Sequence, residues 1–241
     1  MLGLVAVFAV ARFTIGLKPF AAGDTTSPAV AALRDYLDAF ILAGLVALLL
    51  ITFVVRTFYI PSISMVPTLQ VSDVLLVNEL DYHLHDPHSG DVAVFVPPIP
   101  SQGDDFIKRV IGVPGDTLRI SDGIVYRNGV ALREPYENEP PKYDLEIKNY
   151  GIYVDGVPLD PSQANVPPKA LWQAPNRIPK GFYFMLGDNR NYSDDSHVWG
   201  FAQTKGRFAA GLRARSGVKA SFVGRAFLVF WPFGRLSIIS S

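Results

Sequence analysis

The sequence predicts a mainly β protein with a helical membrane segment near its N-terminus. Three observations support this: short apolar runs separated by turns, many prolines and glycines, and one long uncharged apolar stretch. The 241 residues include 19 prolines and 20 glycines, a composition that favours many turns over long helices. A chain of this length can form one or two small domains with a sizeable core.

The overall composition excludes several classes of function. The 22 Lys and Arg residues balance 22 Asp and Glu residues, so nothing indicates a nucleic-acid partner or a strongly acidic substrate. Cysteine is absent, which excludes disulfides, thiolate chemistry and cysteine-based zinc sites. The mean hydropathy of +0.22 is high for a freely soluble protein.

The apolar stretch begins at Leu37, and Asp38 is its only charged residue before Arg56. Residues 39–55 form an uncharged run of 17 residues, the lower limit for a spanning helix. A cleavable signal peptide fits poorly, because the stretch starts late and no Ala-x-Ala follows it. A buried core helix is disfavoured, because the run leaves no polar face. We therefore predict a transmembrane helix over residues 37–56.

Residues 1–17 are also apolar but are interrupted by Arg12, and a first span, an interfacial helix or an upstream artefact of start-codon choice all stay open. Basic residues precede the second apolar stretch, whereas after Arg56 the next one is Lys108. This asymmetry favours a cytoplasmic loop over residues 18–36 and an exported region from residue 57 onward.

Beyond residue 57, short runs rich in β-branched and aromatic residues predict antiparallel strands. The predicted strands cover residues 73–78, 91–96, 106–112 and 182–186, with a closing strand over 222–230. Asn128-Gly129 predicts a tight hairpin within residues 123–132. Residues 134–180 are rich in Pro, Asn, Asp and Tyr and are interpreted as part of a smaller inserted region, β-rich or irregular.

Two segments carry candidate chemistry. Residues 60–69 (IPSISMVPTL) place Ser62 and Ser64 in a turn bracketed by prolines, which can present a hydroxyl but is also ordinary loop composition. In the second segment, residues 106–116, Lys108 lies in an apolar strand and should share a face with Phe106 and Val110. Loss of solvation there would lower the lysine pKa toward that of a general base. A snorkelling edge-strand lysine is the alternative.

Two further segments complete the pattern: the polar cluster GDNRNYSDDSHVWG over 187–200 and the turn GDVAVF over 90–95. In this order, the four segments resemble the sequence boxes of signal peptidase I, the serine–lysine leader peptidase family. The resemblance covers residues 36–116 and 181–232, and the lysine box resembles the bacterial and organellar branch.

The resemblance implies a role for each matched residue. Ser64 would be the nucleophile and Lys108 its general base. Ser62 would donate its hydroxyl to the oxyanion hole beside the Ser64 backbone N–H, and Ser193 would hold the lysine amine. Structural support would come from Arg109, Asp188, Arg190, Asp195 and His197.

His197 is a departure from the family pattern, because arginine is usual at this position. A neutral histidine can still hydrogen-bond Asp195, but the pair would become sensitive to pH near neutrality. This difference puts the local salt bridge in doubt and leaves the catalytic pair unaffected.

The implied activity is that of a membrane-bound serine endopeptidase that cleaves N-terminal signal peptides from exported preproteins, without a metal or organic cofactor. The substrate would be an extended segment with small residues at the first and third positions before the cut, bound by strand addition. Its pockets would be lined by Ile60, Met65, Leu69 and Ile107, for which plain core packing is the alternative.

The implied location is the cytoplasmic membrane, with the catalytic domain on the exported face and the bilayer as a partner. Contact with the export machinery stays open. The predicted division is an N-terminal segment (1–36), the membrane helix (37–56), a catalytic β core (57–116 and 184–241) and an inserted non-catalytic region (117–183).

Two clusters fall outside this pattern. His83, His85, Asp86, His88 and Asp91 could suggest a metal site but have the composition of a solvated loop. Residues 205–219 carry five basic residues and no acid, and could lie on anionic lipid or form a solvated loop. The rival functions are a specialised processing peptidase of the same serine–lysine class and a non-catalytic membrane-anchored binding domain.

Overall fold

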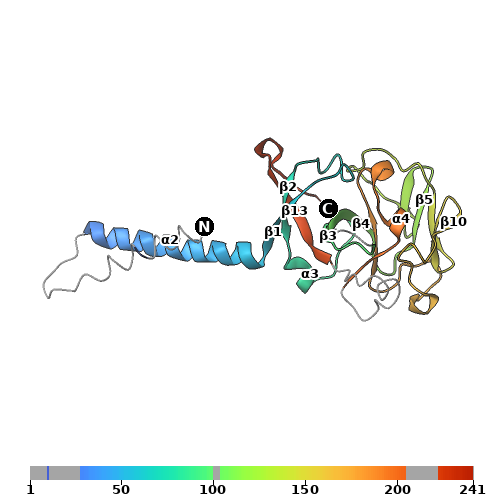
Figure 1. Ribbon diagram of the computed structural model, residues 1–241, viewed down its shortest axis with the longest axis horizontal. Helices are drawn as coiled ribbons and strands as arrows, with labels where there is room; N and C mark the ends of the chain where they lie inside the picture. Colours follow the sequence, from blue (N-terminus) through green and yellow to red (C-terminus); the bar gives the residue numbers. More distant parts are fainter. Residues whose placement is uncertain (1–9, 11–27, 100–103, 205–221, 241) are drawn as a thin grey trace. The chain divides into compact units, whose positions relative to one another are not determined.

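The computed structural model describes residues 10, 28–99, 104–204 and 222–240. The chain divides into two compact units, Met1–Arg56 and Thr57–Ser241. Figure 1 shows a long helix in the first unit and β-strands in the second. Apart from Val10, the apolar stretch 1–17 lies outside the described residues, as does the basic segment 205–219.

The first unit contains one long helix, α2, which runs from Pro28 to Phe53. It begins earlier than the apolar stretch and ends before Arg56, because strand β1 begins at Val55. Within the part of the chain that the structure describes, no helix combines the length and the hydropathy that a bilayer crossing requires. The transmembrane span over 37–56 therefore stays a prediction.

The second unit is built from two antiparallel sheets, which confirms the predicted mainly β class. The larger sheet has the strand order β1-β2-β13-β3-β4-β11-β12, and β14 pairs with β13. Its strands are β1 (Val55–Tyr59), β2 (Val74–Asn78), β3 (Val92–Phe95), β4 (Phe106–Gly112), β11 (Phe182–Leu186), β12 (Ala202–Gln203), β13 (Phe222–Trp231) and β14 (Ser237–Ile238).

The smaller sheet has the order β10-β9-β8-β5-β6-β7. Its strands are β5 (Leu118–Ser121), β6 (Ile124–Arg127), β7 (Val130–Ala131), β8 (Leu145–Lys148), β9 (Gly151–Val154) and β10 (Val157–Pro158). Between β6 and β7 the chain turns at Asn128 and Gly129, whose φ angles are 54° and 80°. The predicted hairpin is thus confirmed.

The structure refines two local expectations. Residues 134–180 contain the strands β8 to β10, which are only two to four residues long and are separated by left-handed turns at Tyr150 and Asp155. Such short runs show no periodicity in the sequence. The expected loop around His83 holds a short helix, α3 (Asp81–Leu84); the remaining short helices are η1 (Lys169–Leu171), η2 (Arg190–Tyr192), α4 (Ser196–Trp199) and η3 (Phe233–Arg235).

Strand β4 lies between β3 and β11, and its alternating side chains enter different cores. Val110 packs with Tyr183, Met185 and Trp199, whereas Ile111 packs with residues of the smaller sheet. A third core forms where the segment after β1 folds over β2, β3 and β13; it includes Ile60, Met65 and Leu69. Burial of these three side chains fixes the turn that carries Ser62 and Ser64.

Candidate active site

The fold brings Ser64 and Lys108 into contact. Ser64 lies in the turn after β1, and Lys108 lies on β4. Lys108 Nζ is hydrogen-bonded to Ser64 Oγ at 2.9 Å. Both residues are buried, with 7% and 5% of their surface exposed. A serine hydroxyl beside a buried amine is an arrangement suited to nucleophilic catalysis.

The surroundings of Lys108 favour its neutral form. Its amine lies 5.5 Å from the centre of the Phe106 ring, on the face of β4 that also carries Val110. Burial lowers the pKa of Lys108, and the negative charges of Asp195, Asp194 and Asp188 oppose this shift without cancelling it. Lys108 Nζ also contacts the Ile107 carbonyl at 3.1 Å, which helps to fix its position.

The turn around Ser64 carries two donor groups, the Ser62 hydroxyl and the Ser64 N–H. Ser62 Oγ lies 3.3 Å from Ser64 Oγ, on the exposed side of the turn. The Ile63 carbonyl accepts a hydrogen bond from the Val66 N–H at 3.1 Å. By contrast, the Ser64 N–H has no acceptor among the described residues. Ser62 and Ser64 thus present the two donors expected of an oxyanion hole.

Ser193 is buried close to this site, but its hydroxyl has no hydrogen-bond partner among the described residues. Its predicted contact with the Lys108 amine is therefore not made in this structure. Ser193 instead lies against Gly187, where an added Cβ would meet both Ser193 Oγ and the Ser64 carbonyl. The turn after β11 thus approaches the Ser64 backbone so closely that only glycine fits at residue 187.

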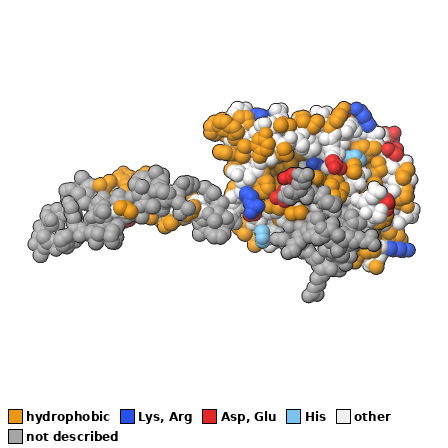
Figure 2. Space-filling model, in the orientation of Figure 1, with side chains coloured by type: hydrophobic (Ala, Val, Ile, Leu, Met, Phe, Trp, Pro, Cys, Tyr) orange, Lys and Arg blue, Asp and Glu red, His pale blue; other side chains and the backbone are white. Residues whose placement is uncertain are grey.

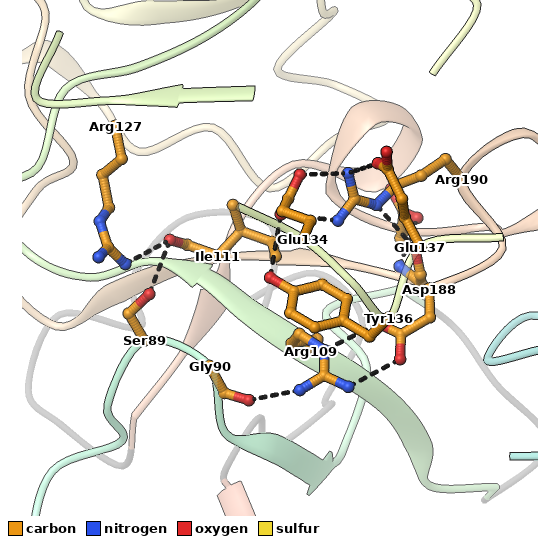
Figure 3. A network of polar contacts seen from close by, with 12 residues as sticks. Ser89, Gly90, Arg109, Ile111, Arg127, Glu134, Tyr136, Glu137, Asp188 and Arg190 are labelled. Atoms are coloured by element: carbon orange, nitrogen blue, oxygen red, sulfur yellow. Dashed lines mark hydrogen bonds and ion pairs between the residues drawn. The ribbon is translucent and has the colours of Figure 1, made fainter. Parts of the chain in front are cut away.

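Arg109 points to the opposite side of β4 and forms a buried ion pair with Asp188 (Figure 3). Its Nε and Nη2 donate to the two Asp188 carboxylate oxygens, each at 2.8 Å, and neither side chain is exposed. Thr68 Oγ1 donates to the same carboxylate at 2.5 Å. The Tyr136 ring lies 3.8 Å from the Arg109 guanidinium. Asp188 therefore ties β4 to the segment that carries Ser64.

Arg190 forms a second buried cluster with Glu134 and Glu137 (Figure 3). Two guanidinium nitrogens donate to Glu134, each at 2.8 Å, and one donates to Glu137 at 3.2 Å. Burial lowers the pKa of Arg190, but these partners outweigh it and hold the pKa above its ordinary value. The cluster ties the segment after β7 to the turn after β11.

Asp195 and His197 form the expected pair. His197 Nδ1 lies 2.6 Å from Asp195 Oδ1, and the ring stacks on Tyr143 with 4.4 Å between centroids. The other Asp195 oxygen accepts from the Gly187 N–H at 2.9 Å. Asp195 thus holds the glycine that lies against Ser64.

Ser64 and Lys108 line a cleft of about 760 Å³. Its walls also include Ser62, apolar and aromatic side chains such as Phe58 and Tyr59, and three aspartates; those aspartates are Asp104, Asp105 and Asp194. Of the four predicted pocket residues, Ile107 lines this cleft. Ile60, Met65 and Leu69 are buried in the core, which is the alternative that the sequence left open.

One edge of β4 is open beside the cleft. Strand β11 pairs with β4 from Arg109 to Gly112, whereas β3 pairs with Phe106 to Arg109 along the other edge. In the described chain, Phe106, Ile107 and Lys108 therefore have no strand partner on the β11 side. This edge can receive an extended peptide.

Comparison with known proteins identifies the family. The model of the family described as "Signal peptidase, peptidase S26" matches residues 33–216. The chain belongs to this family. The probable signal peptidase I-1 of Synechocystis sp. is 36% identical over 87% of this chain and 88% of its own length. The signal peptidase I of Leptolyngbya laminosa is 36% identical over 81% and 78%, respectively.

Among solved structures, a signal peptidase I from Enterococcus faecalis V583 covers 49% of this chain and 91% of its own, with 31% identity and a TM-score of 0.33. The sequence relatives confirm the resemblance that the four segments indicated. The chain is a hydrolase of signal peptides, as the resemblance of the four segments predicted.

The sequence patterns did not predict several residues of the site. Asn189 donates to the Ile63 carbonyl, and Thr68 donates to the Asp188 carboxylate. Both residues lie within the motifs described above. A motif shows that an amide or a hydroxyl is present, but it does not reveal which group that side chain contacts. Glu134 and Tyr136 lie in the inserted stretch, where no motif or periodicity indicates a role for them.

The histidine cluster forms local contacts. His83 Nδ1 lies 2.7 Å from the Glu79 carbonyl, and His85 pairs with Asp81 at 3.4 Å. Across the residues that the structure describes, no three metal-ligating side chains of His, Asp or Glu converge.

Proposed function

We propose that this chain is a membrane-anchored signal peptidase in which Ser64 is the nucleophile and Lys108 the general base. The observation that carries the proposal is the 2.9 Å contact between Lys108 Nζ and Ser64 Oγ, buried at a cleft. A lysine can act as a base at neutral pH when its pKa is lowered, and burial lowers it here.

In the acylation step, neutral Lys108 takes the hydroxyl proton of Ser64 while Ser64 Oγ forms a bond to the scissile carbonyl carbon. The resulting oxyanion is stabilised by the Ser64 N–H and the Ser62 hydroxyl. Loss of one such donor typically lowers turnover roughly 10²- to 10³-fold. The two donors therefore account for a substantial part of the rate.

Protonated Lys108 then gives its proton to the leaving amine as the carbon–nitrogen bond breaks. The acyl group remains as an ester on Ser64. A water molecule attacks this ester, with Lys108 again taking a proton, and the proton returns to Ser64 Oγ when the acid product leaves. The cycle uses these side chains, the Ser64 N–H and one water molecule.

The substrate is proposed to bind as an added strand along the open edge of β4, between Phe106 and Lys108. Its backbone would pair with this edge, and alternate side chains would enter the cleft. Small side chains at the first and third positions would let the substrate backbone approach Ser64.

Two features support anchoring in a membrane. In α2, described side chains such as Phe40, Leu42 and Leu45 are at least half exposed, which suits lipid better than water. The hairpin between β13 and β14 also exposes apolar side chains; these are Phe230, Trp231, Phe233, Leu236 and Ile238. Figure 2 shows hydrophobic side chains gathered at this edge of the second unit. Aromatic residues of this kind favour a membrane interface.

The larger sheet would then be the catalytic core, since β4 and the segment after β1 supply the base and the nucleophile. The smaller sheet, from Leu118 to Pro158, would be the inserted region, supplying no group that reacts. The catalytic side would be the exported face of the cytoplasmic membrane.

A preprotein cleavage assay tests the proposal. The purified full chain in detergent is incubated with a preprotein that carries Ala-x-Ala before the cut, and the new N-terminus of the product is sequenced. The matched control is the same preprotein with Trp in place of the last Ala. We expect cutting after Ala-x-Ala and none in the control. A chain inert on several preproteins, or one that cuts both substrates alike, would contradict the proposal.

A further inference from the structure

The side chain of Asn189 is buried beside the nucleophile, with 4% of the residue exposed. Its Nδ2 donates to the Ile63 carbonyl at 3.1 Å. Its backbone N–H donates to the Ser64 carbonyl, also at 3.1 Å. One residue of the turn after β11 thus contacts the carbonyls of two successive peptide groups in the nucleophile segment.

The first of these contacts bears on the oxyanion hole. The Ile63 carbonyl and the Ser64 N–H belong to one planar peptide group, and in a trans peptide they point in opposite directions. The Val66 N–H and Asn189 Nδ2 both donate to this carbonyl, each at 3.1 Å, and donors that hold the carbonyl also set the direction of the N–H. Asn189 supplies the side-chain donor of the two. Because the Ser64 N–H has no acceptor among the described residues, no bond of its own fixes it.

We propose that Asn189 is a positioning residue that aims the Ser64 N–H at the oxyanion, and that Asn138 fixes the orientation of the Asn189 amide. This inference rests on the proposed function. It assigns Asn189 no contact with substrate, because the residue acts through the Ile63–Ser64 peptide group.

The role of Asn138 follows from the symmetry of an amide. Asn189 can present either oxygen or nitrogen to Ile63, and only nitrogen can donate to a carbonyl. Asn138 Nδ2 donates to Asn189 Oδ1 at 3.3 Å, which favours the orientation with the nitrogen toward Ile63. The Asn138 N–H also donates to the Asp188 carbonyl at 2.9 Å. The segment after β7, outside the larger sheet, thereby reaches the turn that holds the nucleophile.

Rigid surroundings make this arrangement effective. Asp188, the neighbour of Asn189, is fixed by Arg109 and Thr68, and Gly187 lies against the Ser64 carbonyl. The donor therefore cannot follow the peptide group if that group rotates. Preorganisation of this kind is what gives an oxyanion hole its effect, since the donors need no rearrangement during the reaction.

The test uses the full chain with Asn189→Asp. The carboxylate keeps the size of the side chain and still accepts from Asn138, but it places an acceptor against the Ile63 carbonyl. The matched control is Asn191→Asp in the same turn, because Asn191 Nδ2 donates at 2.9 Å to the carbonyl of Pro140, away from the nucleophile. Both variants are compared with wild type in preprotein cleavage and in urea unfolding.

The decisive readout compares two ligands of one sequence. A peptide aldehyde ending in Ala-x-Ala forms a hemiacetal with Ser64 and needs the oxyanion hole, whereas the corresponding peptide alcohol does not. We expect Asn189→Asp to lower kcat/KM and aldehyde affinity by the same factor, about 10²-fold, while alcohol affinity is unchanged. Asn191→Asp should match wild type in kcat/KM and in the affinities for both ligands, because its lost contact with Pro140 lies away from Ser64.

Equal losses for aldehyde and alcohol, or activity at the level of Asn191→Asp, would overturn the inference. If Asn189→Asp does not fold, Asn138→Asp decides, because this exposed position tolerates the change. It should lower kcat/KM about 2- to 10-fold, as expected for one lost hydrogen bond, with the same aldehyde selectivity; no loss would overturn the inference. A wild type that binds the aldehyde but cuts no preprotein would instead overturn the proposed substrate class alone.

Discussion

The buried ion pair between Arg109 and Asp188 makes a quantitative prediction. Neither side chain is exposed, and two hydrogen bonds of 2.8 Å join them. Substituting Arg109→Met leaves the carboxylate buried with Thr68 as its remaining side-chain donor. Removing one partner of such a pair costs about 3–5 kcal/mol, because the other charge stays desolvated. For a unit of this size, that loss lowers the thermal midpoint by about 6–20 °C.

A double-mutant cycle separates the pair from its surroundings. Asp188→Asn should also destabilise the unit, but the double variant should cost less than the sum of the single variants by at least about 1 kcal/mol. Once Arg109→Met has left the Asp188 carboxylate without its partner, Asp188→Asn removes the unpaired charge and so costs less than it does in the wild type. Lys148→Met serves as the surface control, because its pair with Glu146 is 42% and 45% exposed and should contribute below about 1 kcal/mol.

The assay is urea unfolding of the full chain in detergent, and tryptophan fluorescence monitors the transition. The sequence has three tryptophans, at positions 172, 199 and 231, so the signal reports the second unit. Single costs that add within about 0.5 kcal/mol would refute the reasoning. A cost for Arg109→Met no larger than that for Lys148→Met would refute it as well.

Three further predictions concern the site and the anchor. Asp194→Asn removes a charge that raises the pKa of Lys108, so the acidic limb of the kcat/KM profile should move to lower pH; movement to higher pH would contradict the assigned base. Gly187→Ala places a methyl group against the Ser64 carbonyl and Ser193 Oγ, and should lower stability by about 1–3 kcal/mol and abolish cleavage. Wild-type behaviour of that variant in unfolding and cleavage assays would show that the turn can move. The full chain in membranes should resist alkaline carbonate extraction, and its release would count against an anchoring helix.

The longer strands could be predicted from sequence because each contains a run rich in β-branched and aromatic residues between turns. The segment 106–112 is one example: alternation places Lys108 beside Phe106 and sends Arg109 to the other face, as the structure has it. The strands β8 to β10 could not be predicted in this way. They are too short for a period to show. Pairing stabilises them instead: β8 pairs with β5, β9 with β8, and β10 with β9.

The same distinction applies to the site. Ser64 and Lys108 could be named because specific motifs carry them. The partner of Arg190 could not, because Glu134 lies 56 positions away in a stretch without a pattern. Asn189 lies in a recognised motif, but its contact with Ile63 depends on how two distant turns meet. Tertiary contacts of this kind leave no local periodicity in the sequence.

The most direct test of the central claim is whether Ser64 and Lys108 act as one unit. Cleavage rates are measured for wild type, Ser64→Ala, Lys108→Met and the double variant, with Lys148→Met as a control for loss of a lysine. Groups that act together in catalysis are strongly non-additive. We predict that both single variants lose cleavage to the level of the double variant, while Lys148→Met retains the wild-type rate. Substantial cleavage by Lys108→Met, or a double variant slower than either single variant by the product of their losses, would contradict the serine–lysine assignment.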